Sequence, residues 1–161
     1  MRKKVIGIKR VKDDYGWMGN MGICELMYDG KKYKSCEGLF ISMRFDDEEI
    51  KEELRENDNG GMLVKMKSKK YIDKMVVERC SSKDVENMEE VIRLKVDSYN
   101  WMKEELLRLK RNYDEVFIYE DVSNRKEKGN SLFWGGYFDE NKKFVGENIL
   151  GGVWMKIMDE I

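Results

Sequence analysis

Residues 28–45 read YDGKKYKSCEGLFISMRF, and this stretch contains the strongest local signals in the chain. The pair Asp29-Gly30, set between residues that favour strands, predicts a tight β-hairpin over 25–33. Apolar residues then follow at helical spacing: Leu39, Phe40 and Met43. The hairpin is therefore expected to lead directly into a helix, which indicates a mixed fold.

Outside this stretch, strand-like and helix-like segments alternate. Two apolar runs favour strands, Val5–Val11 and Val116–Tyr119, and a turn over 139–143 favours a second hairpin. Apolar residues at helical spacing predict further helices, at 50–54, at 62–67, at 85–99 with Asp84 as N-cap, around 106–107 and at 150–161. We therefore predict an α+β fold, a mainly helical single domain over 1–161 with small β-hairpins and a short sheet.

Length and composition narrow the possible settings of this domain. The chain has 161 residues, 41% hydrophobic and 39% charged, and no apolar run approaches the roughly 18 residues of a membrane span. The apolar run after the first residues is too short for a signal peptide. The three cysteines contain no close pair in sequence, which argues against a disulfide framework or a zinc site. A cytoplasmic protein without a membrane partner is the prediction.

The alphabet of the chain is restricted to fifteen residue types. Ala, Thr, Pro, His and Gln are absent, so no mechanism can use an imidazole. At average usage about eight prolines would be expected. Our hypothesis is an engineered reduced-alphabet variant, and a natural gene encoding this unaltered sequence would refute it. Without proline, the loops at 57–61 and 126–130 are expected to be the most mobile parts.

Charge is nearly balanced overall but uneven along the chain. The net charge is −1, so no global field attracts nucleic acid. Residues 46–57 carry seven acids against two bases, whereas residues 61–80 carry six bases against two acids. Both segments are typical of solvated faces, and the basic one also suits phosphate binding.

A succession of motifs resembles the NADAR family, NAD- and ADP-ribose-associated N-glycosidases. In order, the matching segments are 16–21, 28–45, 62–70, 87–88, 119–125, 132–136 and 146–151. The family pattern Glu-x-Leu/Tyr-Phe/Tyr-x-x-x-Arg/Lys-Phe fits residues 37–45 without a gap. The chain departs from the family at a few positions, with Gly38, Gly61 and Ser131 where relatives have other residues. Some relatives also have Lys at the position of Arg44, and the differences at Arg44 and Ser131 leave the second catalytic group open.

The resemblance implies hydrolysis of a bond between a ribose and a nitrogen base. It implies two substrate classes, ADP-ribose attached to a nucleobase such as guanine in DNA, and phosphoribosyl-pyrimidine metabolites. The segments 119–125 and 132–136 are more similar to the branch associated with the first class. An ADP-ribosyl or NAD-like nucleotide is thus the expected partner, with ADP-ribosylated DNA as its carrier, and no cofactor or metal is expected. A binding module without turnover and a scaffold built to test folding are the alternatives.

Glu37 and Asp121 are the catalytic candidates. An oxocarbenium-like transition state needs a carboxylate near the anomeric carbon and a proton for the departing base. The alternative for Glu37 is a favourable charge at a helix start, and for Asp121 an Asx turn. A Schiff base formed by Lys69 or Lys70 is a rival mechanism.

Nine residues are candidates for substrate binding: Gly19, Asn20, Arg44, Lys69, Arg125, Phe133, Trp134, Gly135 and Asn148. Phe133 and Trp134 can stack on a base, with Gly135 permitting close approach; two core aromatics are the alternative. Asn20 and Asn148 can bond to sugar hydroxyls, although Asn148 also suits a helix cap.

The two arginines are assigned to a diphosphate. Arg44 and Arg125 each offer a planar fork that binds phosphate oxygens in pairs. For Arg44 the competing interpretation is a surface ion pair with Asp47 or Glu48.

Overall fold

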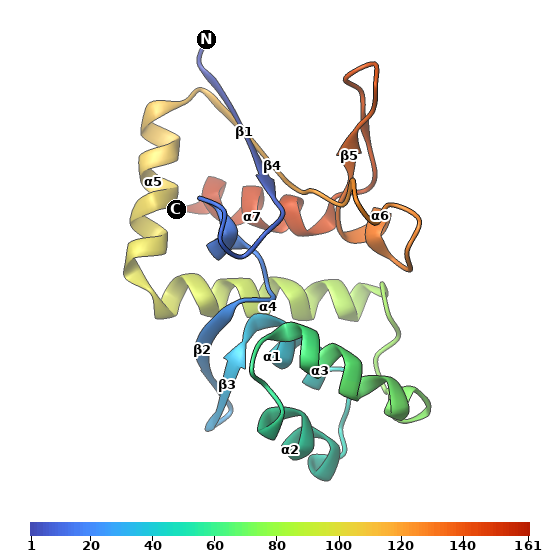
Figure 1. Ribbon diagram of the computed structural model, residues 1–161. Helices are drawn as coiled ribbons and strands as arrows, with labels where there is room; N and C mark the ends of the chain where they lie inside the picture. The colour runs from blue at the N-terminus through green and yellow to red at the C-terminus, as the bar shows by residue number, and fades with distance from the viewer. The chain divides into compact units, whose positions relative to one another are not determined.

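The computed structural model describes all 161 residues, which form two compact units (Figure 1). Residues 20–98 make up the central unit, and residues 1–19 together with 99–161 make up the terminal unit. Helices predominate, and the strands form three two-stranded sheets. The predicted α+β class is confirmed. That the whole chain is one domain stays a prediction.

The predicted hairpin opens the central unit. Strands β2 (Ile23–Tyr28) and β3 (Lys31–Ser35) pair antiparallel, with an irregular register between Ile23 and Leu26. Asp29 and Gly30 both have positive φ, at 51° and 75°, as the tight hairpin turn requires. The Asp-Gly signal was therefore correct, and the strands extend two residues further on each side.

Five helical segments complete the central unit: α1 (Cys36–Ser42), α2 (Glu48–Glu56), α3 (Gly61–Ser68), the 3-10 segment η2 (Lys69–Lys74) and α4 (Ser82–Ser98). Helix α1 is its centre, since it packs against α2, α3, α4 and both strands. One core cluster joins α1, α2 and α3 through Ile41, Phe45, Ile50, Leu54 and Val64. The helical periodicities therefore predicted α1, α2, α3 and α4 to within a few residues, whereas η2 was not predicted.

The predicted N-cap of α4 is wrong. The helix begins at Ser82, and Asp84 lies inside its first turn. The Asp84 carboxylate instead accepts from Arg44 and from the backbone N–H of Cys80. The carboxylate of Asp84, which was predicted to cap the helix, is therefore bound by the buried Arg44.

The terminal unit is built on a parallel strand pair. Strand β1 (Lys3–Ile8) lies beside β4 (Glu115–Glu120), with Lys3 opposite Glu115, and α7 (Ile149–Glu160) packs on β4 (Figure 1). The first strand was predicted to end at Val11, but β1 ends three residues earlier, at Ile8, because a turn begins at Val11. The indole N–H of Trp154 in α7 donates to the carbonyl of Met18, which fixes the helix to the preceding loop.

The other elements of this unit are the 3-10 turn η1 (Gly16–Met18), α5 (Asn100–Asn112), α6 (Ser131–Trp134), β5 (Tyr137–Phe138) and β6 (Phe144–Val145). The β5–β6 pair is the second predicted hairpin. None of the helices combines the length and hydropathy that crossing a bilayer requires.

Candidate functional site

Glu37 lies in the first turn of α1, at a junction held by backbone hydrogen bonds. The N–H of Glu37 donates to the carbonyl of Asn20 at 3.0 Å. Ser35 is the N-cap of the helix, and its Oγ accepts from the N–H of Gly38 at 3.0 Å. The direction in which the Glu37 side chain leaves the helix is therefore fixed on both sides.

Asp58 clamps this junction from the loop after α2. Its carboxylate is buried and accepts from the N–H of Lys34 at 2.8 Å, and from the N–H and Oγ of Ser35 at 3.0 and 2.7 Å. A Cβ on Gly38 would lie 2.2 Å from this carboxylate, which explains the glycine after Glu37. This role of Asp58 was not predicted, because an acidic residue flanked by Asn and Gly is typical of a solvated loop.

Helix α3 begins in contact with Glu37. The N–H of Gly61 donates to the carbonyl of Met21 at 2.8 Å. A Cβ on Gly61 would lie 2.5 Å from the Cβ of Glu37, so only glycine permits this approach. The stem of Glu37 is thus packed between two segments that are distant in sequence.

Among the predicted binding residues, Asn20 is hydrogen-bonded to Glu37 through the backbone. It is buried, and its Nδ2 donates to the sulfur of Met88 at 3.2 Å. Its Oδ1 is buried and has no donor partner. A buried amide oxygen left unpaired costs about 1–3 kcal/mol, so a donor such as a sugar hydroxyl would be favoured there.

Arg44 is committed to Asp84. Its Nε and Nη2 each donate to one carboxylate oxygen at 2.9 Å, and both side chains are buried. Its guanidinium also lies over the ring of Phe40, 4.5 Å from the centroid. The surface pair with Asp47 or Glu48 is therefore not formed, and a diphosphate would have to compete with Asp84.

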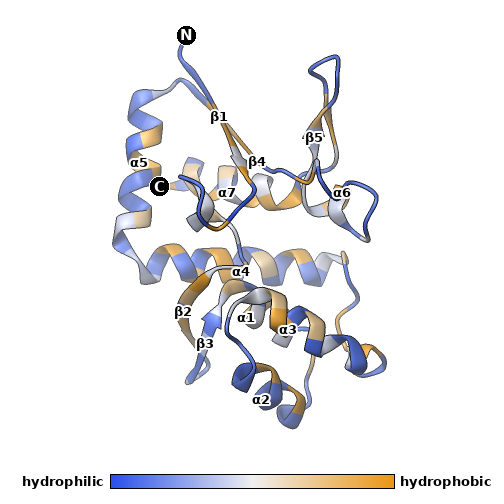
Figure 2. Ribbon diagram, in the orientation of Figure 1, coloured by the Kyte–Doolittle hydropathy of each residue, from blue (hydrophilic) through white to orange (hydrophobic).

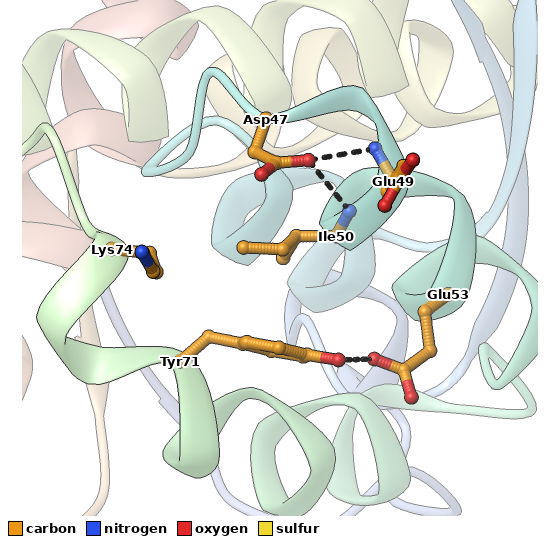
Figure 3. Close-up of a pocket in the computed structure, with 6 residues that line it drawn as sticks. All are labelled: Asp47, Glu49, Ile50, Glu53, Tyr71 and Lys74. Atoms are coloured by element: carbon orange, nitrogen blue, oxygen red, sulfur yellow. Dashed lines mark hydrogen bonds between the residues drawn. The ribbon is translucent and has the colours of Figure 1, made fainter.

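Lys69 and Lys70 lie on the surface at the start of η2. Lys70 pairs with Glu53 at 2.9 Å. A hollow of about 480 Å³ opens nearby, as Figure 3 shows, lined by Asp47, Glu49, Ile50, Glu53, Tyr71 and Lys74. The phenol of Tyr71 donates to Glu53 across it. None of the predicted site residues lines this hollow.

The sequence analysis also missed Lys95. This lysine of α4 is only 2% exposed, and its charge acts on the thiol of Cys36, the residue before Glu37. The apolar stripe of α4 contained the signal, because Lys95 occupies a position three to four residues from Val91 and Ile92.

Cys24 and Cys36 form a close thiol pair, although the sequence contained no close spacing. Their hydrogen bond, together with burial, raises the pKa of Cys36 well above its usual value, and Lys95 partly opposes this rise. The hairpin is the cause, since its register sets Ile23 opposite Ser35. Sequence spacing could not indicate this pairing.

Asp121 follows β4 in the terminal unit and forms the Asx turn that was its alternative. Its Oδ1 accepts from the N–H of Ser123 at 2.9 Å, and its Oδ2 lies 3.9 Å from the Nζ of Lys9. The neighbouring Glu120 was not a predicted site residue. Its Oε2 lies 3.4 Å from the Nη2 of Arg125. Arg125 thus has a carboxylate partner, and its Nη1 also donates to the Oγ of Ser131.

Asn148 extends the edge of β4. It adopts a left-handed conformation, with φ of 54°, and its side chain makes no helix cap. Its Nδ2 donates to the carbonyl of Ile118 at 2.9 Å, and its Oδ1 accepts from the N–H of Glu120 at 3.2 Å. The capping interpretation is wrong for this side chain.

The glycines near α6 serve the backbone of the unit itself. A Cβ on Gly135 would lie 2.4 Å from the carbonyl oxygen of Glu120. The rings of Phe133 and Trp134 are half-buried and meet edge to face, with centroids 5.0 Å apart. Gly19 ends η1, with its N–H on the carbonyl of Gly16. Binding roles for these residues stay predictions.

Comparison with known proteins identifies the fold. No protein-family model matches the chain, and no curated protein matches it in sequence. Among solved structures, the NMR structure of the E. coli protein YbiA is similar, with a TM-score of 0.75 and 23% identity over 99% of this chain and 86% of that one. At this identity the likeness concerns the fold alone. The chain therefore has a fold similar to that of YbiA.

Proposed function

We propose that the chain is an N-glycosidase that removes ADP-ribose from a guanine base in DNA. The proposal rests on the motif succession, on the YbiA-like fold and above all on the clamped position of Glu37. A carboxylate at a helix start needs no such clamp for the helix dipole alone. A fixed direction is what a transition-state contact requires.

The proposed reaction is a hydrolysis at the anomeric carbon of the ribose. The bond from this carbon to the base nitrogen breaks, its electron pair and a proton go to the base, and the oxygen of water bonds to the carbon. Glu37 stabilises the positive charge that develops on the sugar, accepts a proton from the water and passes this proton to the base. Asn20 holds a ribose hydroxyl through its unpartnered Oδ1.

A lysine mechanism is the rival, and Lys95 is its better-placed candidate. In that route an amine displaces the base, and the ring-opened sugar forms an imine that water later hydrolyses. Lys95 is buried near the residue preceding Glu37, whereas Lys69 and Lys70 are exposed. Borohydride reduction distinguishes the routes, since it traps an imine as a stable adduct. If the adduct is lost in Lys95→Met but kept in Lys70→Met, the group that attacks the sugar is Lys95 and not a water activated by Glu37.

The decisive assay follows free ADP-ribose released from guanine-ADP-ribosylated DNA. Glu37→Gln should reduce the rate by about a hundredfold or more while the melting temperature changes little, since the amide keeps the shape of the side chain. Glu25→Gln on β2 is the matched control, because this glutamate is exposed and lies 3.8 Å from the Nζ of Lys32 at the surface.

Three results would contradict the proposal. A near-normal rate in Glu37→Gln would move the carboxylate role to Asp121. Binding of ADP-ribose without any release would identify a binding module. Release of the base from a phosphoribosyl-pyrimidine, but not from DNA, would assign the chain to the other substrate class.

A further inference from the structure

Helix α3 presents an unusual exposed face. Met62, Lys65, Met66 and Lys69 follow at spacings of three and four residues, so they share one side of the helix and its extension; we name this set the α3 face. The opposite side is buried through Gly61, Val64 and Ser68. Helix α3 therefore packs against the core on one side and exposes two large apolar side chains, Met62 and Met66, on the other.

The exposure of the two methionines is large. Met62 is 62% exposed and Met66 is 60% exposed, and Ile72 and Val76 in the following segment are more than half exposed. In Figure 2 hydrophobic colours cover the early part of α3 and hydrophilic colours its end. Adjacent exposed apolar side chains on one surface are typical of a binding surface.

The charge around this face is positive and mostly unneutralised. Between residues 65 and 74 the chain has five lysines, and of these only Lys70 forms an ion pair, with Glu53. Lys65 and Lys69 are one helical turn apart on the α3 face itself. This concentration contrasts with the net charge of −1 for the whole chain, so any attraction for anions is local.

We propose that the α3 face is a docking surface for a nucleic-acid strand. Lysines one turn apart, about 6 Å along the helix, can hold successive phosphates of a strand, while methionine side chains pack against base faces or between base steps. A membrane is the less suitable partner. Interfacial helices bury a continuous apolar face, whereas here lysines alternate with methionines and the helix has only eight residues.

The position of α3 connects this surface to the proposed function, on which this step rests. The helix starts at Gly61, in contact with the stem of Glu37. Gly61 belongs to the buried side of α3, so a strand on the α3 face would lie on the helix that packs against Glu37 but not against the carboxylate itself. This shared helix favours a base within a strand over a small metabolite as the substrate.

The experiment measures the binding of a fluorescent single-stranded oligonucleotide without ADP-ribose, by anisotropy, to the full chain at several salt concentrations. The wild-type chain should bind with a dissociation constant on the order of 10–100 µM at roughly 0.1 M salt. Lys65→Ser/Lys69→Ser should weaken binding at least about fivefold and reduce the salt slope by about 1.4, or about 0.7 per lost phosphate contact. Met62→Ser/Met66→Ser should weaken binding with an unchanged slope, because apolar contacts release no counterions.

The control removes the same charge elsewhere in the central unit. Lys31→Ser/Lys32→Ser, in the exposed hairpin, should leave affinity and slope near the wild-type values. Equal losses in this control, or no binding by the wild type, would overturn the proposal. The proposal would also be overturned if the chain bound phosphatidylserine vesicles but not the oligonucleotide, and if the α3-face variants abolished this vesicle binding.

The two proposals fail separately. The probe contains no ADP-ribose, so its binding does not depend on turnover. A chain that binds the strand but releases no ADP-ribose from modified DNA would contradict the enzyme assignment alone. A chain that hydrolyses modified DNA without measurable strand binding would contradict the α3 face alone.

Discussion

At the scale of single residues, buried polar groups with satisfied partners position the candidate site. Asp58 and Asp84 are each almost completely buried, and each accepts several hydrogen bonds from groups distant in sequence. A buried carboxylate is tolerated only with such partners, because an unpaired charge away from water is very unfavourable. These acids therefore connect segments that the sequence alone does not bring together.

The pair of Arg44 and Asp84 gives a prediction about stability. Arg44→Met should lower the free energy of unfolding by about 3–5 kcal/mol, because it leaves the buried charge of Asp84 unpaired. Adding Asp84→Asn should recover part of this loss, since a neutral amide is less costly to bury. Denaturant titration of the two single variants and the double variant measures the coupling.

An exposed ion pair supplies the comparison. Arg108→Met removes a pair with Glu105 that is largely in solvent, and should change the free energy of unfolding far less than Arg44→Met. If both arginine variants lose the same stability, the burial argument is wrong. If Arg44→Met instead folds normally and binds ADP-ribose more weakly, Arg44 is a diphosphate ligand as the sequence indicated.

At the scale of elements, the two loops expected to be mobile differ in their anchoring. Loop 57–61 contains the buried Asp58, and its Asp58 and Gly61 amides donate to the carbonyls of Arg55 and Met21. Residues 126–130 are exposed, with Gly129 at a φ of 49°. Composition alone treated both loops alike, because it contains no information about which side chain points inward.

Hydrogen exchange should separate these loops. We expect the amides of Asp58 and Gly61 to exchange more slowly than those of 126–130, since local opening of 57–61 requires breaking the clamp on α1. Asp58→Asn should abolish the difference, because the amide nitrogen of Asn cannot accept from Ser35 or Lys34. Equal fast exchange of both loops in the wild type would restore the expectation from composition.

Helix α7 tests the effect of an alphabet without alanine. Gly152 is exposed within the helix, with open space around its Cα, so Gly152→Ala should stabilise the chain by about 1 kcal/mol. Gly151→Ala is the matched control and should destabilise it, because a Cβ there would lie 2.1 Å from the carbonyl of Ile118. Thermal unfolding of both variants is the measurement, and a stabilising Gly151→Ala would disprove the packing argument.

At the scale of the whole molecule, local sequence signals predicted secondary-structure elements. Contacts between residues distant in sequence were not predicted. The Asp29-Gly30 turn and the helical periodicities depend on neighbouring residues, so both hairpins and the longer helices were predicted, whereas η1, η2 and α6 were not. The parallel pairing of β1 with β4 joins residues more than a hundred positions apart and carries no turn signal. The same holds for the site: Glu37 followed from a motif, whereas Asp58 and Lys95 required the packed chain.

The response of the molecule to alkaline pH follows from Tyr28, which links β2 to α4. Its phenol donates to Glu90 at 2.9 Å, and burial together with this carboxylate raises its pKa from 10.0 to about 12. Since the folded chain keeps the proton longer than the unfolded chain, this contribution to stability is complete below pH 10 and is lost as the pH rises toward 12. Tyr28→Phe lacks this titration and should be less stable at neutral pH by about 1 kcal/mol, the lost hydrogen bond. Denaturant midpoints of both chains from pH 8 to 12 measure the gap, in which the lysines common to both cancel. The gap should close between pH 10 and 12; a constant gap would mean that Tyr28 titrates alike in the folded and unfolded chains.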